Sequence, residues 1–144
     1  MLKLAFIAVT YLTYFVTNSE FHDDNTVEKI LENAEVKTIE QINREIDKVV
    51  EKLDTKTRKE HKEWKLKVEK EEKQRKMRIF NVLPKLSTKT QQKLIRIVMT
   101  QQNQQLTVGE KERILKHIAT SMDENVKREL ARHLNQKDLF SILY

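Results

Sequence analysis

The chain has 144 residues, of which 35% are charged and 6% aromatic, with one glycine, one proline, no cysteine and a net charge of +6. This length predicts a single domain, and the scarcity of glycine and proline argues against β-hairpins and phosphate-binding loops. We therefore predict an all-α protein, a compact bundle of five or six helices, held by packing without disulfides.

The positive charge is concentrated in one part of the sequence. Residues 56–78 contain eleven Lys and Arg against five Glu, whereas residues 20–35 contain six Asp and Glu against one Lys. Because opposite charges attract, we expect the acidic segment to lie near the basic one, within the chain or across a dimer.

The first nineteen residues have the layout of a secretory signal peptide. Lys3 precedes an uncharged run, Leu4–Val16, which is shorter than the ~20 residues of a membrane span. Small or polar side chains then occupy the −3 and −1 positions of a cleavage site before Glu20. We predict a signal peptide at residues 1–19, a single helical domain at residues 20–144 and an extracellular location. An uncleaved anchor and a buried N-terminal helix are the alternatives.

Two amphipathic helices are predicted before the basic segment. Thr26 can cap the first, and Thr38 caps the second, where Gln41 completes a capping box. Apolar residues recur in both at the helical spacing of three or four positions. The predicted inward residues are Val27, Ile30, Leu31 and Ala34, then Ile39, Ile42, Ile46, Val49, Val50 and Leu53.

The longest predicted element is a charged helix over about residues 56–83, which Asp54 and Thr55 precede and Pro84 closes. It would be about 40 Å long at 1.5 Å per residue. Its apolar side chains gather at the two ends, so we expect the ends to pack and the middle to face water. Those side chains are Trp64 and Val68, then Ile79, Phe80, Val82 and Leu83.

Three more helices and an apolar tail follow. Ser87 is the expected N-cap of the first, Thr107 and Glu110 form a capping box for the second, and Asp123 caps the third. The tail, residues 139–144, either packs back on the bundle or forms an interaction patch. The predicted inward residues are Leu94, Ile95, Val98 and Met99, then Val108, Ile114, Leu115, Ile118 and Met122, then Val126, Leu130, Ala131 and Leu134.

No set of catalytic residues is apparent, so we do not expect an enzyme. Cysteine is absent, and no serine lies in a nucleophile elbow. The four histidines lack zinc-binding spacing, and a calcium loop around Gly109 would lack its acidic ligands. Asp23 with Asp24, and Glu69 with Glu72, are looser candidates for a hard cation, but each pair fits a capping or surface role better.

Two features of the long helix could bind a ligand. His61 lies one turn before Trp64, and we interpret both as packing side chains, with Trp64 between the long helix and the helix before it. The lysines suggest nucleic acid, but glutamates are interspersed and the basic centre lacks aromatic residues, so we expect no such partner. An anionic membrane surface, a glycan or an acidic protein fits the charge better, unless the charges only keep the helix soluble.

Several ordered features together resemble a known family. A helix over Ile39–Leu53 leads into a Lys/Glu-rich helix with an aromatic residue at Trp64. The later runs are Val82-Leu83-Pro84-Lys85-Leu86-Ser87, Leu106-Thr107 before Ile114 and Ile118, and Val126-Lys127-Arg128-Glu129-Leu130. Over residues 27–134 this order is similar to the SXP/RAL family of small secreted nematode proteins, whose domain is also described as an anisakid-allergen-like cation-binding domain.

The resemblance implies a secreted, all-α, non-enzymatic protein that is often immunogenic and binds a divalent cation, magnesium or calcium. It assigns no ligand residues. The chain departs from the family in having Asp54-Thr55 where a glycine-containing junction is common, and in being basic. We therefore expect a nematode binding or interaction protein with a host or other extracellular protein as partner. Two alternatives remain open: a carrier of a fatty acid or other apolar ligand, and a basic module that binds anionic surfaces.

Overall fold

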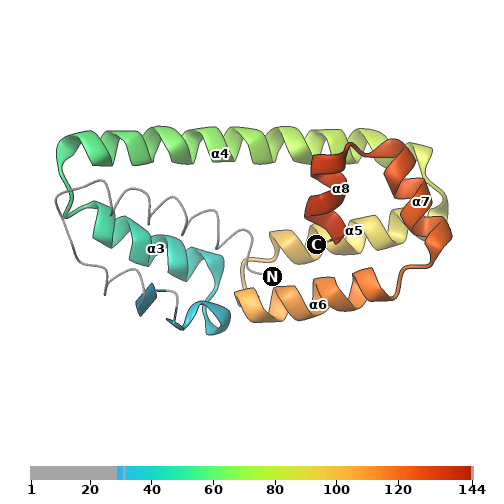
Figure 1. Ribbon diagram of the computed structural model, residues 1–144, viewed down its shortest axis with the longest axis horizontal. Coiled ribbons are helices and arrows are strands. Elements are labelled where there is room, and N and C mark those ends of the chain that lie inside the picture. The colour runs from blue at the N-terminus through green and yellow to red at the C-terminus, as the bar shows by residue number, and fades with distance from the viewer. Residues whose placement is uncertain (1–28, 31, 144) are drawn as a thin grey trace. The chain divides into compact units, whose positions relative to one another are not determined.

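A computed structural model of the protein describes residues 29–30 and 32–143, which contain six α-helices and no β-strand (Figure 1). The all-α prediction is therefore confirmed. The predicted signal peptide, the cap at Thr26 and most of the acidic segment 20–35 lie outside the described residues. The elements are η1 (Ala34–Val36), α3 (Ile39–Val50), α4 (Thr55–Val82), η2 (Leu83–Lys85), α5 (Thr88–Gln102), α6 (Val108–Thr120), α7 (Glu124–His133) and α8 (Gln136–Leu143).

The chain divides into two compact units, and α4 and α6 contribute to both. Unit 1 contains the chain up to Lys67 together with Gln104–Glu110. Unit 2 contains Val68–Asn103 together with the chain from Lys111 onward. The single domain over residues 20–144 stays a prediction.

Helix α3 supplies half of the buried core residues of unit 1, Ile42, Ile46 and Val50, as its apolar pattern predicts. Its start is fixed by the expected capping box: the Thr38 hydroxyl accepts from the Gln41 N–H at 3.2 Å, and Gln41 Oε1 accepts from the Thr38 N–H at 2.8 Å. Satisfying two free N–H groups in this way stabilises the first turn. The buried cluster comprises Ile30, Ala34, Ile42, Ile46, Val50 and Leu53.

The start of α6 is tied to the start of α3 within unit 1. The Val108 N–H donates to the Lys37 carbonyl at 2.8 Å, beside an isolated antiparallel bridge between Thr38 and Thr107. The capping box of Thr107 and Glu110 also forms. The Thr107 N–H donates to Glu110 Oε2 at 2.8 Å, and the Glu110 N–H donates to the Thr107 hydroxyl at 3.2 Å. Gly109 lies so close to η1 that a Cβ atom at this position would be 2.9 Å from the backbone oxygen of Glu35.

Helix α4 begins and ends within one residue of the predicted range 56–83. Asp54 caps it, because its carboxylate accepts from the Thr57 N–H at 3.0 Å and from the Thr57 hydroxyl at 2.5 Å. The helix is buried at Thr57 and His61 near its start and at Ile79 near its end, whereas its middle is mainly exposed. Packing at both ends is thus confirmed, although Trp64 and Val68 are only half-buried. The prediction is wrong for Phe80, which is 54% exposed.

Unit 2 has its own core, to which α4, α5, α6, α7 and α8 all contribute. The buried cluster comprises Ile79, Leu86, Leu94, Ile97, Ile118, Met122, Val126, Leu130, Leu134 and Ile142. The prediction for α5 is partly wrong, because Ile95 and Met99 are 42% and 67% exposed while Ile97 is completely buried. Ala131 of α7 is also exposed, contrary to prediction. In α5 the inward face is rotated from the one that hydrophobicity predicts, whereas in α7 the predicted residues Val126, Leu130 and Leu134 are buried.

Residues 139–143 of the apolar tail belong to α8, which packs on the rest of unit 2 (Figure 1). Ile142 is 2% exposed, and Leu139 packs against the same core. Asn135 caps the helix, because its Oδ1 accepts from the Asp138 N–H at 2.8 Å. Asp138 is itself 1% exposed and accepts from Arg78 Nε and Nη2, both at 2.8 Å. This bidentate pair joins α8 to α4 and holds the pKa of Asp138 below its usual range.

Replacing Asp138 with Ala should therefore weaken the docking of α8. We expect a loss of roughly 1–3 kcal/mol in the free energy of unfolding, below the 3–5 kcal/mol of a fully buried pair because solvent can reach Arg78. Urea unfolding and amide hydrogen exchange in α8 measure the change. Glu71→Ala, which removes the exposed partner of Lys137, is the matched control and should cost less than about 0.5 kcal/mol. Equal losses in the two variants would contradict this account.

Candidate functional site

The net charge of the described residues lies almost entirely in unit 2. Unit 2 contains sixteen Lys and Arg against eight Asp and Glu, a formal charge of +8. The described part of unit 1 contains eleven against ten, a formal charge of +1. Unit 2 is therefore the part of the structure that would attract an anionic partner.

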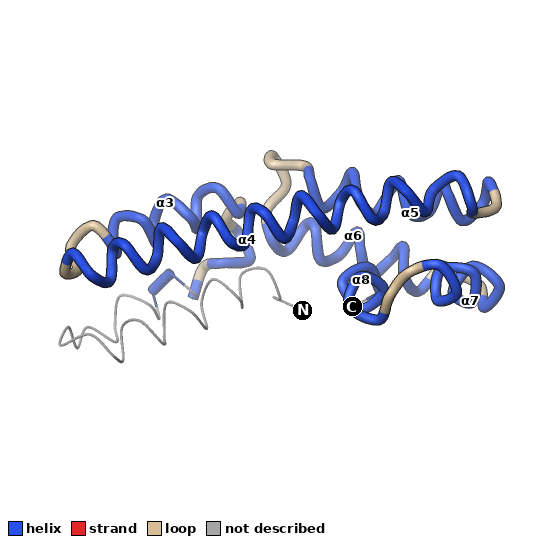
Figure 2. Tube along the Cα trace, turned by 90° about the horizontal axis from the view of Figure 1, so that it is seen from above, coloured by secondary structure: helices blue, strands red, loops and turns tan. Residues whose placement is uncertain are grey.

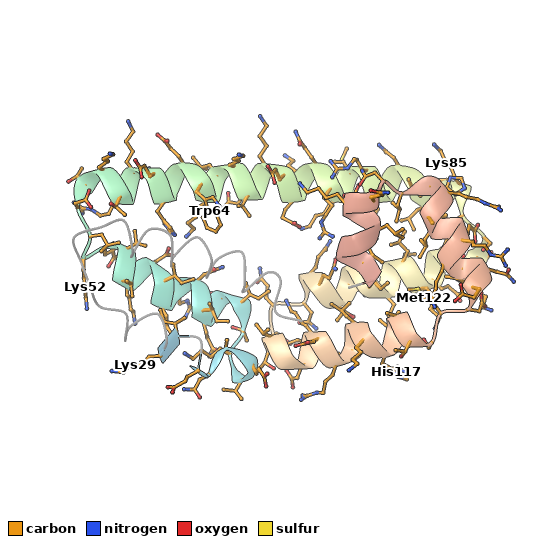
Figure 3. All side chains as sticks on the ribbon, in the orientation of Figure 1. Lys29, Lys52, Trp64, Lys85, His117 and Met122 are labelled. Carbon is orange, nitrogen blue, oxygen red and sulfur yellow. The ribbon has the colours of Figure 1, made fainter. Side chains whose placement is uncertain are left out.

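Most acidic side chains of unit 2 are already engaged by basic groups. Ion pairs form between Lys137 and Glu71 at 3.7 Å, Arg75 and Glu72 at 2.9 Å, Arg78 and Asp138 at 2.8 Å, Lys89 and Asp123 at 2.5 Å, and Lys127 and Glu124 at 2.9 Å. Each pair uses one basic group, so the remaining lysines and arginines carry the excess charge. Lys70, Lys73 and Lys85 are exposed and make no ion pair within the described residues. Lys85 lies in η2, between α4 and α5 (Figure 3).

Glu129 of α7 is held by the start of α5. Its Oε1 accepts from the Ser87 N–H at 2.6 Å, and its Oε2 accepts from the Ser87 hydroxyl at 2.6 Å and from the Thr90 hydroxyl. These hydrogen bonds lower the pKa of Glu129 to about 2, and the bond from the Ser87 hydroxyl has the largest effect on it. Ser87 occupies the N-cap position of α5, as predicted. The side chain of Ser87 accepts no capping hydrogen bond from the backbone of α5; instead, its hydroxyl and its backbone N–H both donate to the carboxylate of Glu129.

Helix α4 presents lysines and large apolar side chains on one exposed face of unit 2. Lys70, Lys73, Met77 and Phe80 follow one another at spacings of three or four residues, which places them along one side of the helix. Met77 is 58% exposed and Phe80 is 54% exposed. Glu69, one turn before Lys73, adds a negative charge on this side.

The exposed apolar residues of α5 lie level with those of α4. The two helices run antiparallel, with Arg75 hydrogen-bonded to Gln101 at 3.3 and 3.4 Å and Gln91 to the Leu83 carbonyl at 2.9 Å. This register places Met99 at the height of Met77, and Ile95 at the height of Phe80. We call these four residues, with Lys70 and Lys73, the outer face.

The outer face is turned away from α7 and α8. Figure 2 shows these two helices on one side of α4 and α5. They contact α4 and α5 through Arg78 and Thr90. Phe80 lies about 160° around the helix from Arg78, and Ile95 lies about 140° around the helix from Thr90. Both apolar residues therefore project from sides that α7 and α8 do not cover.

The candidate cation ligands are not gathered into a site by the described structure. Asp23 and Asp24 lie outside the described residues. The carboxylate of Glu72 accepts hydrogen bonds from Nε and Nη2 of Arg75, at 3.2 and 2.9 Å. Glu72 is therefore engaged by a cationic side chain and is not available to bind a metal ion together with Glu69. Within residues 29–30 and 32–143, no group of three or more His, Asp or Glu side chains could hold a metal ion.

His61 has the buried environment expected of a packing residue in unit 1. It is 8% exposed, its ring centroid is 5.8 Å from that of Trp64, and burial lowers its pKa. Lys65, on the same helix, pairs with both carboxylate oxygens of Asp47 in α3 at 3.0 Å. Trp64 is half-buried and lies on α4 (Figure 3). These contacts join α3 to the first part of α4.

Comparisons with protein-family models, with curated proteins and with solved structures find no match to this chain. None of the described helices has the length and apolar character needed to cross a membrane. The outer face, where exposed lysines lie beside exposed apolar side chains, is the strongest candidate site. The apolar pattern of the sequence misses it because that pattern assigns Ile95 and Met99 to the core. The residues Thr90, Leu94, Ile97 and Gln101, spaced three or four positions apart, mark the true inward face of α5. Because Thr90 and Gln101 are polar, an apolar pattern does not identify this face.

Replacing Glu129 with Gln should reduce both the stability of the protein and its sensitivity to acid. The folded pKa of about 2 lies below the usual value of 4.5, so this carboxylate stabilises the fold fully above pH 4.5 and loses that effect as the pH falls toward 2. Urea unfolding between neutral and acidic pH should show a shallower pH dependence in E129Q than in the wild type.

Glu124→Gln is the matched control for this experiment. Glu124 lies on the same helix and is exposed, and within the described part of the chain its side chain pairs with Lys127 alone. The pH dependence of E124Q should equal that of the wild type. A wild-type slope in E129Q would show that the hydrogen bonds to Glu129 are not formed in solution.

Proposed function

We propose that the chain is a secreted, non-catalytic helical binding protein of the SXP/RAL type, and that it binds anionic partners through unit 2. The observation that carries this proposal is the charge of unit 2, sixteen basic against eight acidic residues, with most of the acids engaged in ion pairs or hydrogen bonds. Such a field raises the local concentration of anionic groups and speeds their association.

The outer face supplies a place where these charges are accessible. Lys70 and Lys73 project from α4 next to each other and make no ion pair within the described residues. Binding therefore does not require an internal ion pair to be broken first, which would cost part of the attraction. Neither the carrier alternative nor cation binding has a comparable observation behind it.

Removing charge from the outer face should weaken binding to a soluble polyanion such as heparin. Each lysine near an anionic surface contributes about 1 kcal/mol, so Lys70→Gln/Lys73→Gln should lose roughly thirtyfold in affinity at low salt. Added salt should reduce the difference between the variant and the wild type, because exposed charges are screened. Calorimetry or heparin-column elution measures the effect.

Lys48→Gln/Lys52→Gln is the control, because both lysines are exposed in unit 1 and the charge change is the same. This variant should bind heparin almost as tightly as the wild type. Equal weakening in the two double variants, or no heparin binding by the wild type, would reject unit 2 as the binding surface.

Secretion makes a separate prediction. Expressed from its full sequence in a eukaryotic host, the protein should appear in the medium with Glu20 as its first residue, because the −3 and −1 positions suit signal peptidase. Native mass spectrometry of the secreted material reports the cleavage site together with any bound ion, lipid or second copy. Retention in the cell with an intact N-terminus would contradict the proposed location.

A further inference from the structure

The outer face exposes large apolar side chains within the most basic unit of the protein. Met77, Phe80, Ile95 and Met99 are 58%, 54%, 42% and 67% exposed. Two of them lie on α4 and two at the matching levels of α5, so they extend over both helices of the antiparallel pair. Scattered apolar residues on a surface are normal, but a group of this size on one face indicates a binding site.

The combination of charge and apolar surface restricts the chemistry of the partner. A glycan or an acidic peptide could pair with Lys70 and Lys73, but it would offer little to four exposed apolar side chains. The surface of a lipid bilayer offers both, because an apolar helix face enters only about 5–10 Å into the boundary between headgroups and acyl chains and so stays beside the anionic headgroups. Amphipathic helices bind such surfaces through apolar burial together with attraction to anionic lipids.

We infer that the outer face of unit 2 binds the surface of an anionic phospholipid bilayer. Met77, Phe80, Ile95 and Met99 enter the boundary between headgroups and acyl chains, while Lys70 and Lys73 lie at the level of the phosphates. Helices α4 and α5 then lie along the membrane and do not cross it. This inference rests on the proposed function and names the source of its anionic groups.

The test compares two kinds of vesicle and one soluble polyanion. Wild-type protein should sediment with vesicles of phosphatidylcholine mixed with phosphatidylserine, and only weakly with vesicles of phosphatidylcholine alone. Met77→Ser/Phe80→Ser should lose about tenfold or more in affinity for the mixed vesicles, because apolar burial is removed. Its affinity for heparin should stay unchanged, since no charge is altered.

Two controls separate this effect from unfolding and from general hydrophobicity. Both replaced side chains are more than half exposed, so the variant should keep the wild-type circular dichroism spectrum and unfolding midpoint. Val36→Ser replaces an apolar side chain that is 71% exposed in unit 1, and it should leave vesicle binding unchanged.

Glu69→Lys should strengthen binding to the mixed vesicles, because it replaces a negative charge next to Lys73, which anionic lipids repel, with a positive charge that they attract.

Insertion can also be observed directly. In a Trp64→Phe background, Phe80→Trp places the single tryptophan of the chain on the outer face. Its emission should shift to shorter wavelength with the mixed vesicles and should be quenched by brominated lipid. Heparin should cause neither change.

The outcomes distinguish failure of this inference from failure of the proposed function. If Met77→Ser/Phe80→Ser binds both vesicles and heparin like the wild type, and the tryptophan emission does not shift, the lipid inference is overturned while anionic binding stands. The inference is likewise overturned if the wild type binds heparin but no vesicle, which would point to a soluble anionic partner. If the wild type binds neither, both proposals fail.

Discussion

The carboxylate of Glu129 determines which face of α5 is buried. It accepts hydrogen bonds from Ser87 and Thr90, and Thr90 is completely buried as a result, although it is a polar residue in the first turn of its helix. With Thr90 turned inward, Leu94 and Ile97 follow on the same side one and two turns later. Ile95 and Met99 are then placed outward. The exposed apolar surface of unit 2 is thus a consequence of a polar contact.

The features predicted correctly are those that depend on neighbours in the sequence. Both capping boxes form between residues three apart, and α4 ends where Pro84 prevents the helix from continuing. The apolar spacing of α3 identifies its buried residues because polar residues separate the apolar ones clearly. Local rules therefore predicted most helix boundaries, the core of unit 1 and most of the buried residues of unit 2.

The features missed depend on residues far apart in the sequence. Five of the six residues from Leu94 to Met99 are apolar, so more than one rotation of α5 buries an apolar face, and the choice between them is made by a glutamate 39 positions from Thr90. Helix α8 is short, and its Asp138 is held by an arginine 60 positions away. Neither partner can be chosen from spacing alone, because many acidic and basic residues of the chain are equally plausible. The candidate site was missed for the same reason.

The one glycine of the sequence has a further consequence. At Gly109 the first turn of α6 passes the carbonyl group of Glu35 so closely that even a methyl group would be 2.9 Å from its oxygen. The obstacle is backbone, which cannot move aside as a flexible side chain would. Surface lysines of this chain can be exchanged with little cost to the fold, whereas this position tolerates no side chain without moving the backbone. In any comparison with distant relatives, Gly109 should therefore be a better point of alignment than the basic residues that dominate the composition.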